Sequence, residues 1–215
     1  MKTNTRSQLR ALAEARRGVL VPGAFNALSA RVIADLGFEA LYITGAGVTN
    51  MALGLPDQGF MGLAEIAGHT ARIRDAVDLP LIVDADTGFG NALNVRHTVR
   101  TLERAGADCI QLEDQVAPKR CGHFVGKEVI ATEQAVNKIK AAVERAQKFA
   151  ELGFGIVLYA NAAFQGALAG MQKALSVLRE TGRLEEDPAL VAPFAERQRL
   201  VGKPAWDAME RRYTD

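Results

Sequence analysis

Short apolar segments alternate with helical stretches along most of the chain, and the joins between them resemble one another. A helical stretch runs through a glycine into an apolar segment at residues 34–46 (ADLGFEALYITGA), 103–114 (ERAGADCIQLED) and 150–162 (AELGFGIVLYANA). The glycine is able to take the left-handed conformation that ends a helix. The Val, Ile and Leu residues after it are typical of a buried strand. Two further strands are predicted at 19–22 and 80–85.

Helices are predicted between these strands, for example at 27–36 and 64–77. Three more follow the last strand, at 166–180, 188–200 and 204–212. Strands without polar alternation belong to a parallel sheet covered by helices, so the pattern predicts an α/β fold, either a doubly wound sheet or a (β/α) barrel. No G-x-G-x-x-G motif follows the first strand, which weighs against a dinucleotide-binding fold. No Pro- or Ser-rich linker divides the chain, and we expect a single domain over residues 1–215.

Composition excludes several classes of protein. Of the 215 residues 48% are apolar, and 26 Lys and Arg residues against 25 Asp and Glu residues leave a net charge of +1. The apolar fraction is too high for a disordered chain. The balanced charge lacks the basic excess of nucleic-acid or anionic-membrane proteins, and no apolar run reaches the roughly 18–20 residues that span a bilayer.

The two cysteines, Cys109 and Cys121, form no C-x-x-C pair, so reduced thiols are expected. The amino-terminal segment has no signal-peptide apolar core and is predicted to be an amphipathic helix. We therefore expect a cytoplasmic protein without nucleic-acid or membrane partners. Cys109 opens a predicted strand and is interpreted as a small core residue.

Acidic side chains follow the predicted strands, where ligands bind in both α/β fold types. Asp84 and Asp86 follow one strand and Glu113 follows the next, while Asp57 lies in a segment, GAGVTNMALGLPDQGF, expected to be a long loop. Residues two apart on a strand share a face, so Asp84 and Asp86 should point the same way. Converging carboxylates need a cation, and hard oxygen ligands suit Mg²⁺ or Mn²⁺ better than zinc. The alternative is that Asp84 and Asp86 cap the next helix or form a surface turn.

A cluster of reactive residues, Lys-Arg-Cys-Gly-His at 119–123, comes soon after this acidic strand end. A thiol flanked by Lys119, Arg120 and His123 should have a lowered pKa and exchange a proton near neutrality. The alternative is a basic loop with an incidental cysteine. A zinc site is not favoured, because Cys121 and His123 lack further ligands.

Four segments together resemble the isocitrate lyase/phosphoenolpyruvate mutase superfamily. They are VPGAFNALSARVIADLGFEALYITGAG at 21–47, LGLPDQGF at 53–60, VDADTGFGNALNV at 83–95 and LEDQVAPKRCGHFVGKEVI at 112–130. The match runs almost without gaps from about residue 8 to residue 143. The resemblance implies a (β/α) TIM barrel of the phosphoenolpyruvate/pyruvate group that binds Mg²⁺ with a 2-oxo or 2-hydroxy acid and forms an enolate.

The resemblance also implies roles for the acidic residues. Asp84 corresponds to the direct metal ligand, Asp86 and Glu113 hold its waters, and Asp57 lies beside the metal shell. The substrate's carboxylate is gripped in relatives by a loop that corresponds to Tyr42, Thr44, Gly45 and Ala46. Thr44 and Ala46 stand where many relatives have Ser and Gly.

The 119–123 segment resembles the mobile catalytic loop of the lyase branch. By this resemblance Cys121 is the general acid, Lys119 and His123 tune it, and Gly122 and His123 contact the substrate. Phosphonate-forming mutases carry a different loop without the cysteine. The expected activity is therefore carbon–carbon cleavage of a branched 2-hydroxy di- or tricarboxylic acid of the methylisocitrate or dimethylmalate type. A phosphoenolpyruvate or carboxyphosphonoenolpyruvate mutase and an oxaloacetate decarboxylase stay open.

The chain departs from the family after Lys140. Three βα units of the eight-stranded barrel have no counterpart, and residues 133–150 run into a segment that resembles the eighth strand, so one amphipathic helix is expected across the join. Five strands cannot close a barrel, and we expect either an open sheet with helices over its edges, a second chain covering them, or an internally deleted and inactive remnant. The helical part at 166–215 is expected to pack either on its own sheet or on a neighbouring subunit of a dimer or tetramer.

Overall fold

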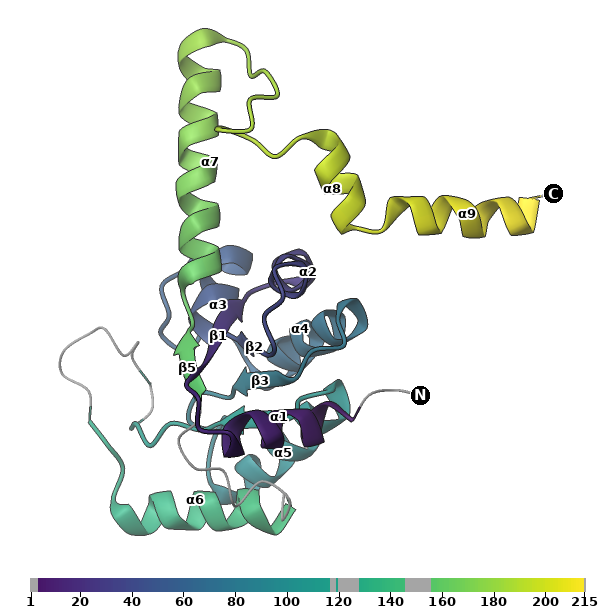
Figure 1. Cartoon of the computed structure of the whole chain (residues 1–215). Coiled ribbons are helices and arrows are strands. Elements are labelled where there is room, and N and C mark those ends of the chain that lie inside the picture. Colours follow the sequence, from purple (N-terminus) through teal and green to yellow (C-terminus); the bar gives the residue numbers. More distant parts are fainter. Residues whose placement is uncertain (1–3, 117–118, 120–127, 146–155, 215) are drawn as a thin grey trace. The chain divides into compact units, whose positions relative to one another are not determined.

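The computed structural model describes residues 4–116, 119, 128–145 and 156–214 (Figure 1). In chain order its elements are α1 (Thr5–Glu14), β1 (Val19–Ala24), α2 (Ala27–Asp35), β2 (Leu41–Ile43), α3 (Gly45–Leu53), α4 (Leu63–Ala76), β3 (Leu81–Asp84), α5 (Ala92–Ala105), β4 (Cys109–Gln111), α6 (Thr132–Arg145), β5 (Ile156–Tyr159), α7 (Ala162–Thr181), α8 (Phe194–Leu200) and α9 (Lys203–Thr214). They group into two compact units, residues 1–162 and 163–215. The prediction of one domain over the whole chain stays a prediction.

The five strands form one sheet in which every described pair is parallel. Its order is β4-β3-β2-β1-β5. A doubly wound sheet reverses direction at a switch point, whereas here β1 to β4 follow one another across the sheet and the last strand, β5, lies beside β1. That is the winding of a (β/α) barrel. No pairing joins β4 to β5 among the described residues, so the sheet is the open, five-stranded form of such a barrel.

Local signals in the sequence explain where the helices begin and end. The Asn26 side chain accepts a hydrogen bond from Ser29 N at 2.8 Å, and the Ser29 hydroxyl accepts one from Asn26 N at 3.1 Å, which starts α2. Gly37 and Gly106 follow α2 and α5 with φ of 78° and 104°, as expected for glycines that end helices. The third such glycine, Gly153, lies outside the described residues.

One segment expected to be a loop is a helix instead. Residues 45–53 form α3, because Thr44 caps its amino end, accepting a hydrogen bond from Gly47 N at 3.2 Å, and Gly54 ends it in the left-handed conformation. Two glycines in its first turn lower the helix propensity, which hides the helix in the sequence. The helix expected across 133–150 is observed as α6, over Thr132–Arg145, and its expected continuation lies outside the described residues.

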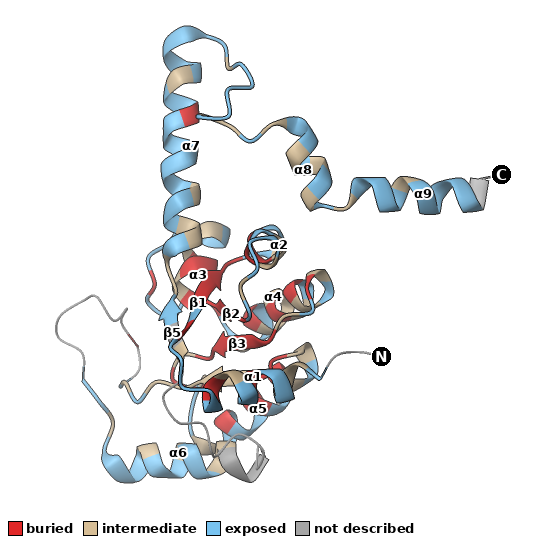
Figure 2. Cartoon of the chain, in the orientation of Figure 1, coloured by how far each residue is buried: buried red, intermediate tan, exposed pale blue. Residues whose placement is uncertain are grey.

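The core lies where α1 and the central strands pack together. Leu9, Val19, Val21, Tyr42 and Ile82 belong to one cluster of buried side chains. Figure 2 shows β1, β2 and β3 as mainly buried. On the neighbouring strands β1 and β5, Leu20 and Leu158 are 51% and 40% exposed. Apolar side chains are thus left uncovered within the described residues, as expected for a sheet of this kind that does not close.

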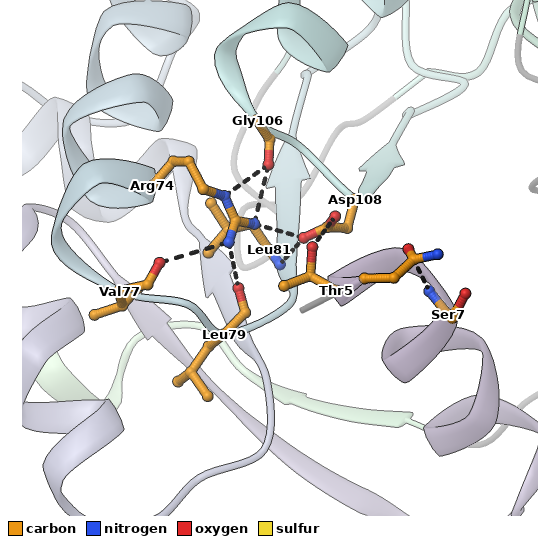
Figure 3. Close-up of polar contacts among 9 residues, drawn as sticks. Thr5, Ser7, Arg74, Val77, Leu79, Leu81, Gly106 and Asp108 are labelled. Atoms are coloured by element: carbon orange, nitrogen blue, oxygen red, sulfur yellow. Dashed lines mark hydrogen bonds and ion pairs between the residues drawn. The ribbon is translucent and has the colours of Figure 1, made fainter. Parts of the chain in front are cut away.

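A polar network fastens α1 and α4 to the amino ends of β3 and β4 (Figure 3). Arg74 Nη2 lies 2.5 Å from Asp108 Oδ2, which also accepts a hydrogen bond from Leu81 N at 2.9 Å. Asp108 Oδ1 accepts one from the Thr5 hydroxyl at 2.7 Å, and Arg74 Nη2 donates to Gly106 O at 3.0 Å. The network lies at the amino ends of the strands, opposite the ends that carry Asp84 and Glu113. In a barrel, contacts at the amino ends stabilise the fold.

The carboxyl-terminal unit consists of α7, α8 and α9. Four large apolar residues spaced along α7 are exposed: Leu168, Met171, Leu175 and Leu178. Lys173 Nζ donates a hydrogen bond to Ala189 O at 3.0 Å within this unit. Packing of this part on a neighbouring subunit stays a prediction. None of the helices in the described part of the chain is long and apolar enough to cross a bilayer.

Candidate active site

The register of the sheet brings the ends of β2, β3 and β4 together. Ile43 pairs with Val83, and Asp84, the last residue of β3, pairs with Gln111 of β4. Directly after β2, Gly45 N donates a hydrogen bond to Asp84 Oδ2 at 3.2 Å. A Cβ at Gly45 would lie 3.0 Å from that oxygen, closer than ordinary contact. A larger residue at position 45 would therefore press on the Asp84 carboxylate.

Asp86 joins the site through a turn and not through strand alternation. Asp86 has a φ of 48°, and β3 ends at Asp84. The prediction that Asp84 and Asp86 point the same way because they share a strand face therefore rested on the wrong reason. Asp86 N donates to Asp84 Oδ1 at 3.0 Å, and Asp86 O accepts from Glu113 N at 2.8 Å. The turn therefore ties Glu113, which follows β4, to the end of β3.

The capping interpretation of the two aspartates is wrong. Helix α5 begins after Asn91, whose side-chain oxygen accepts hydrogen bonds from Leu93 N at 2.9 Å and Asn94 N at 3.2 Å. Asp84 is 8% exposed, so it does not lie in a surface turn either. The Asp84 carboxylate instead accepts hydrogen bonds from Asp86 N and from Gly45 N, the first residue of α3.

Lys119 lies among the carboxylates, although the sequence had suggested only a role beside Cys121. It is 5% exposed. Its Nζ lies 2.8 Å from Asp57 Oδ1, 2.9 Å from Asp57 Oδ2 and 2.6 Å from Asp86 Oδ1. The contact with Asp86 is an ion pair without hydrogen-bond geometry, and Asp86 Oδ1 is buried without accepting a hydrogen bond.

Burial and mutual repulsion shift the pKa values of the acids. Burial raises the pKa of Asp86 to about 6, against the lowering effect of Lys119, and Asp84 and Asp57 raise it further. Burial also raises the pKa of Glu113, and the Tyr42 pKa is raised by burial and by Asp84. Tyr42 therefore keeps its proton at neutral pH.

For Lys119 burial alone would lower the pKa. Its close contacts with the carboxylates of Asp57 and Asp86 outweigh burial and raise the pKa, so this side chain stays a cation. The sequence signal that could have placed it here is the need of several converging acids for a counter-charge.

The remaining predicted site residues divide into two groups. Thr44 and Ala46 lie at the start of α3, and the Thr44 hydroxyl is engaged by Gly47 N. Cys121, Gly122 and His123 lie outside the described residues. One further lysine was missed: Lys138 Nζ of α6 donates to Thr87 O at 2.9 Å and so supports the turn that carries Asp86. No pattern in the sequence distinguishes Lys138 from the other polar residues of that helix.

The donor set fits a hard divalent cation in kind. Asp84, Asp86, Glu113 and Asp57 supply carboxylate oxygens, the ligands that Mg²⁺ takes, and the buried Asp86 Oδ1 lacks a hydrogen bond. In the described ranges, however, no three acidic, His or Cys side chains lie close enough to form a coordination group. The Lys119 ammonium stands between two of the four carboxylates.

The amino-terminal two thirds of the chain match known proteins in sequence. A family model described as phosphoenolpyruvate phosphomutase matches residues 9–148. A 2,3-dimethylmalate lyase from Eubacterium barkeri is 50% identical over 141 residues, covering 66% of this chain and 49% of that protein. A 2-methylisocitrate lyase from Aeropyrum pernix is 53% identical over 135 residues, covering 63% and 44%. The chain thus spans about half the length of the curated relatives it matches.

Solved structures show the same fold. A crystal structure of 2,3-dimethylmalate lyase matches with a TM-score of 0.86 at 24% identity, covering 98% of this chain and 95% of that one. Phosphonopyruvate hydrolase in complex with oxalate and Mg²⁺ matches with a TM-score of 0.84 at 23% identity, covering 98% and 99%. At these identities the likeness concerns the fold alone.

Proposed function

Because the chain belongs to the isocitrate lyase/phosphoenolpyruvate mutase superfamily, we propose that it serves Mg²⁺-dependent carbon–carbon cleavage of a branched 2-hydroxy di- or tricarboxylic acid. The methylisocitrate and dimethylmalate types are favoured, since relatives at 53% and 50% identity carry those names. The observation that supports the proposal most is that Asp84, Asp86 and Glu113 follow neighbouring strand ends and are linked by hydrogen bonds of the Asp86 backbone.

Asp84, Asp86 and Glu113 would hold the divalent cation. When bound, it supplies positive charge that favours the negatively charged carboxylate and the enolate-like fragment. The backbone N–H groups at the start of α3, from Gly45 and Ala46, are donors suited to a substrate carboxylate. Tyr42, protonated at neutral pH, adds a hydroxyl donor beside Asp84.

The bond-breaking step needs a proton donor for the departing carbanion. Cys121 takes this role by resemblance, with His123 and Lys119 beside it in the sequence. The hydroxyl proton of the substrate passes to a base as the C–C bond breaks, one fragment leaves with a new C=O bond, and the other receives the proton from the thiol.

A second candidate, a non-catalytic remnant, rests on a different observation. The described strands number five and leave β4 and β5 unpaired with each other, so the side of the pocket that three further βα units supply in an eight-stranded barrel has no counterpart here. For this reason we expect slow turnover at most, and the remnant is the outcome if turnover is absent.

The test is a coupled assay for release of pyruvate or succinate from 2,3-dimethylmalate and 2-methylisocitrate with MgCl₂. We expect slow release that is lost in Asp84→Ala and in Cys121→Ser. Asp78→Ala removes an exposed aspartate and Cys109→Ser removes the other thiol, and both should keep the wild-type rate. Release that persists in Asp84→Ala would refute the proposed site. Formation of a phosphonate from phosphoenolpyruvate would favour a mutase instead.

A further inference from the structure

Lys119 is held as a metal ion would be held. Its ammonium is almost fully removed from water. Three carboxylate oxygens on two side chains, Asp57 and Asp86, lie within 2.9 Å of Nζ. Burying a charge is costly unless the charge is paired. In this arrangement the ammonium and the carboxylates compensate each other's buried charge.

The surroundings of the ammonium concentrate negative charge further. Asp84 lies next to Asp86 through the Asp86 N–H hydrogen bond, and Glu113 is tied to the same turn. Asp84 and Asp57 raise the pKa of Asp86, and the same two acids together with Asp86 raise the pKa of Glu113. Lys119 forms ion pairs with two of the four acids, Asp57 and Asp86.

A divalent cation bound by these acids would meet the same oxygens. Of the three oxygens that contact Nζ, Asp86 Oδ1 is the closest, at 2.6 Å, so a metal ion that binds this oxygen meets the ammonium there. Two cations at this oxygen oppose each other, since like charges a few ångströms apart repel by several kcal/mol even at an effective dielectric constant of about 20.

We propose that Lys119 is a built-in counter-ion of the acidic pocket and that its ammonium and a divalent cation exclude each other. Lys119 is then a positioning residue: it keeps the carboxylates assembled without metal and leaves Asp86 when the metal binds. The proposal rests on the proposed function, since it takes Mg²⁺ as the cation of this pocket. It adds that Mg²⁺ must displace the Lys119 ammonium from Asp86 in order to bind, which weakens the affinity for Mg²⁺.

Calorimetric titration with MgCl₂ tests the exclusion. Lys119→Met removes the competing charge and keeps the aliphatic stem, and we expect Mg²⁺ to bind at least about tenfold more tightly than to the wild type. Lys140→Met removes an exposed lysine of α6 and leaves the affinity unchanged, which controls for net charge. Equal or weaker Mg²⁺ binding by Lys119→Met would overturn the proposal.

A second measurement uses the wild-type protein and needs no variant to fold. Lysine acetylation by an N-hydroxysuccinimide ester, followed by peptide mass spectrometry, reports whether the amine is accessible. We expect Lys119 to react several-fold faster with saturating MgCl₂ than without it, while Lys140 reacts equally in both. Unchanged protection of Lys119 with Mg²⁺ bound would contradict displacement.

The two failures are distinguishable. Absence of Mg²⁺ binding in both the wild type and Lys119→Met would refute the metal site and this proposal together. Binding of Mg²⁺ by both proteins with equal affinity would leave the proposed function standing and refute only the role of Lys119.

Discussion

Replacing Asp108 by alanine should destabilise the amino-terminal unit more than any other single change at the amino ends of the strands. Asp108 is 3% exposed and holds three groups at once: the Arg74 guanidinium, the Leu81 N–H and the Thr5 hydroxyl. Asp108→Ala leaves a half-buried arginine without its carboxylate and a buried backbone donor without its acceptor.

The expected cost is the sum of named losses. Removing one partner of a buried ion pair costs about 3–5 kcal/mol, which includes the unpaired groups left behind. A chain of this size loses about 2–4 °C in Tm for each kcal/mol, so a fall of roughly 6–20 °C is expected. Thr5→Ala removes a single hydrogen bond and should cost about 1 kcal/mol.

Urea unfolding followed by circular dichroism measures the effect, and the slope of the transition should not change. Asp78→Ala is the matched control, because Asp78 lines the same cavity as Asp108, about 560 Å³ in volume, but is exposed. A double-mutant cycle with Arg74→Met isolates the pair. A loss below about 1 kcal/mol for Asp108→Ala would refute the view that this network fastens α1 and α4 to the sheet.

Three further predictions concern single groups. Gly45→Ala should weaken Mg²⁺ binding in a calorimetric titration, because the new Cβ lies 3.0 Å from Asp84 Oδ2; unchanged affinity would show that the carboxylate position is not critical. Burial raises the pKa of Cys109 from 9.0 to about 11. In the Cys121→Ser variant, iodoacetamide should therefore label Cys109 about 100-fold more slowly in the native protein than in urea. Equal labelling rates would contradict the burial of Cys109. Asp86 has a pKa of about 6 in the folded protein, against 3.8 when unfolded, so it binds protons more tightly when folded. Its contribution to stability is therefore present below about pH 4 and is lost as the pH rises through 6. Between pH 4 and pH 7 the metal-free Asp86→Asn variant should lose less unfolding free energy than the wild type, and parallel pH profiles would contradict the shift.

The sequence was informative wherever a short-range rule decides the structure. The Val, Ile and Leu runs predicted all five described strands, because a strand buried on both faces admits few polar residues. Gly37 and Gly106 marked helix ends because a left-handed residue follows the helix there. The acids at the ends of β3 and β4 could be placed together because parallel strands end at one edge of a sheet.

The sequence was less informative where tertiary contacts override local preference. Helix α3 begins at Gly45, beside Asp84, and glycines at the start of a helix look like a loop in the sequence. The left-handed turn at Asp86 could not be foreseen from alternation, since alternation stops where β3 stops. Lys119 lies 62 positions from Asp57 in the chain, and only folding brings the two charges together.

Titration with Mn²⁺ followed by electron paramagnetic resonance tests the acidic pocket most directly. We expect one Mn²⁺ per chain to lose its free-ion signal, to be displaced by Mg²⁺, and to stay free when Asp84 is replaced by alanine, while Asp78→Ala binds as the wild type does. A wild-type chain that leaves all Mn²⁺ free, or an Asp84→Ala variant that binds it unchanged, would contradict a divalent-cation site at the ends of these strands.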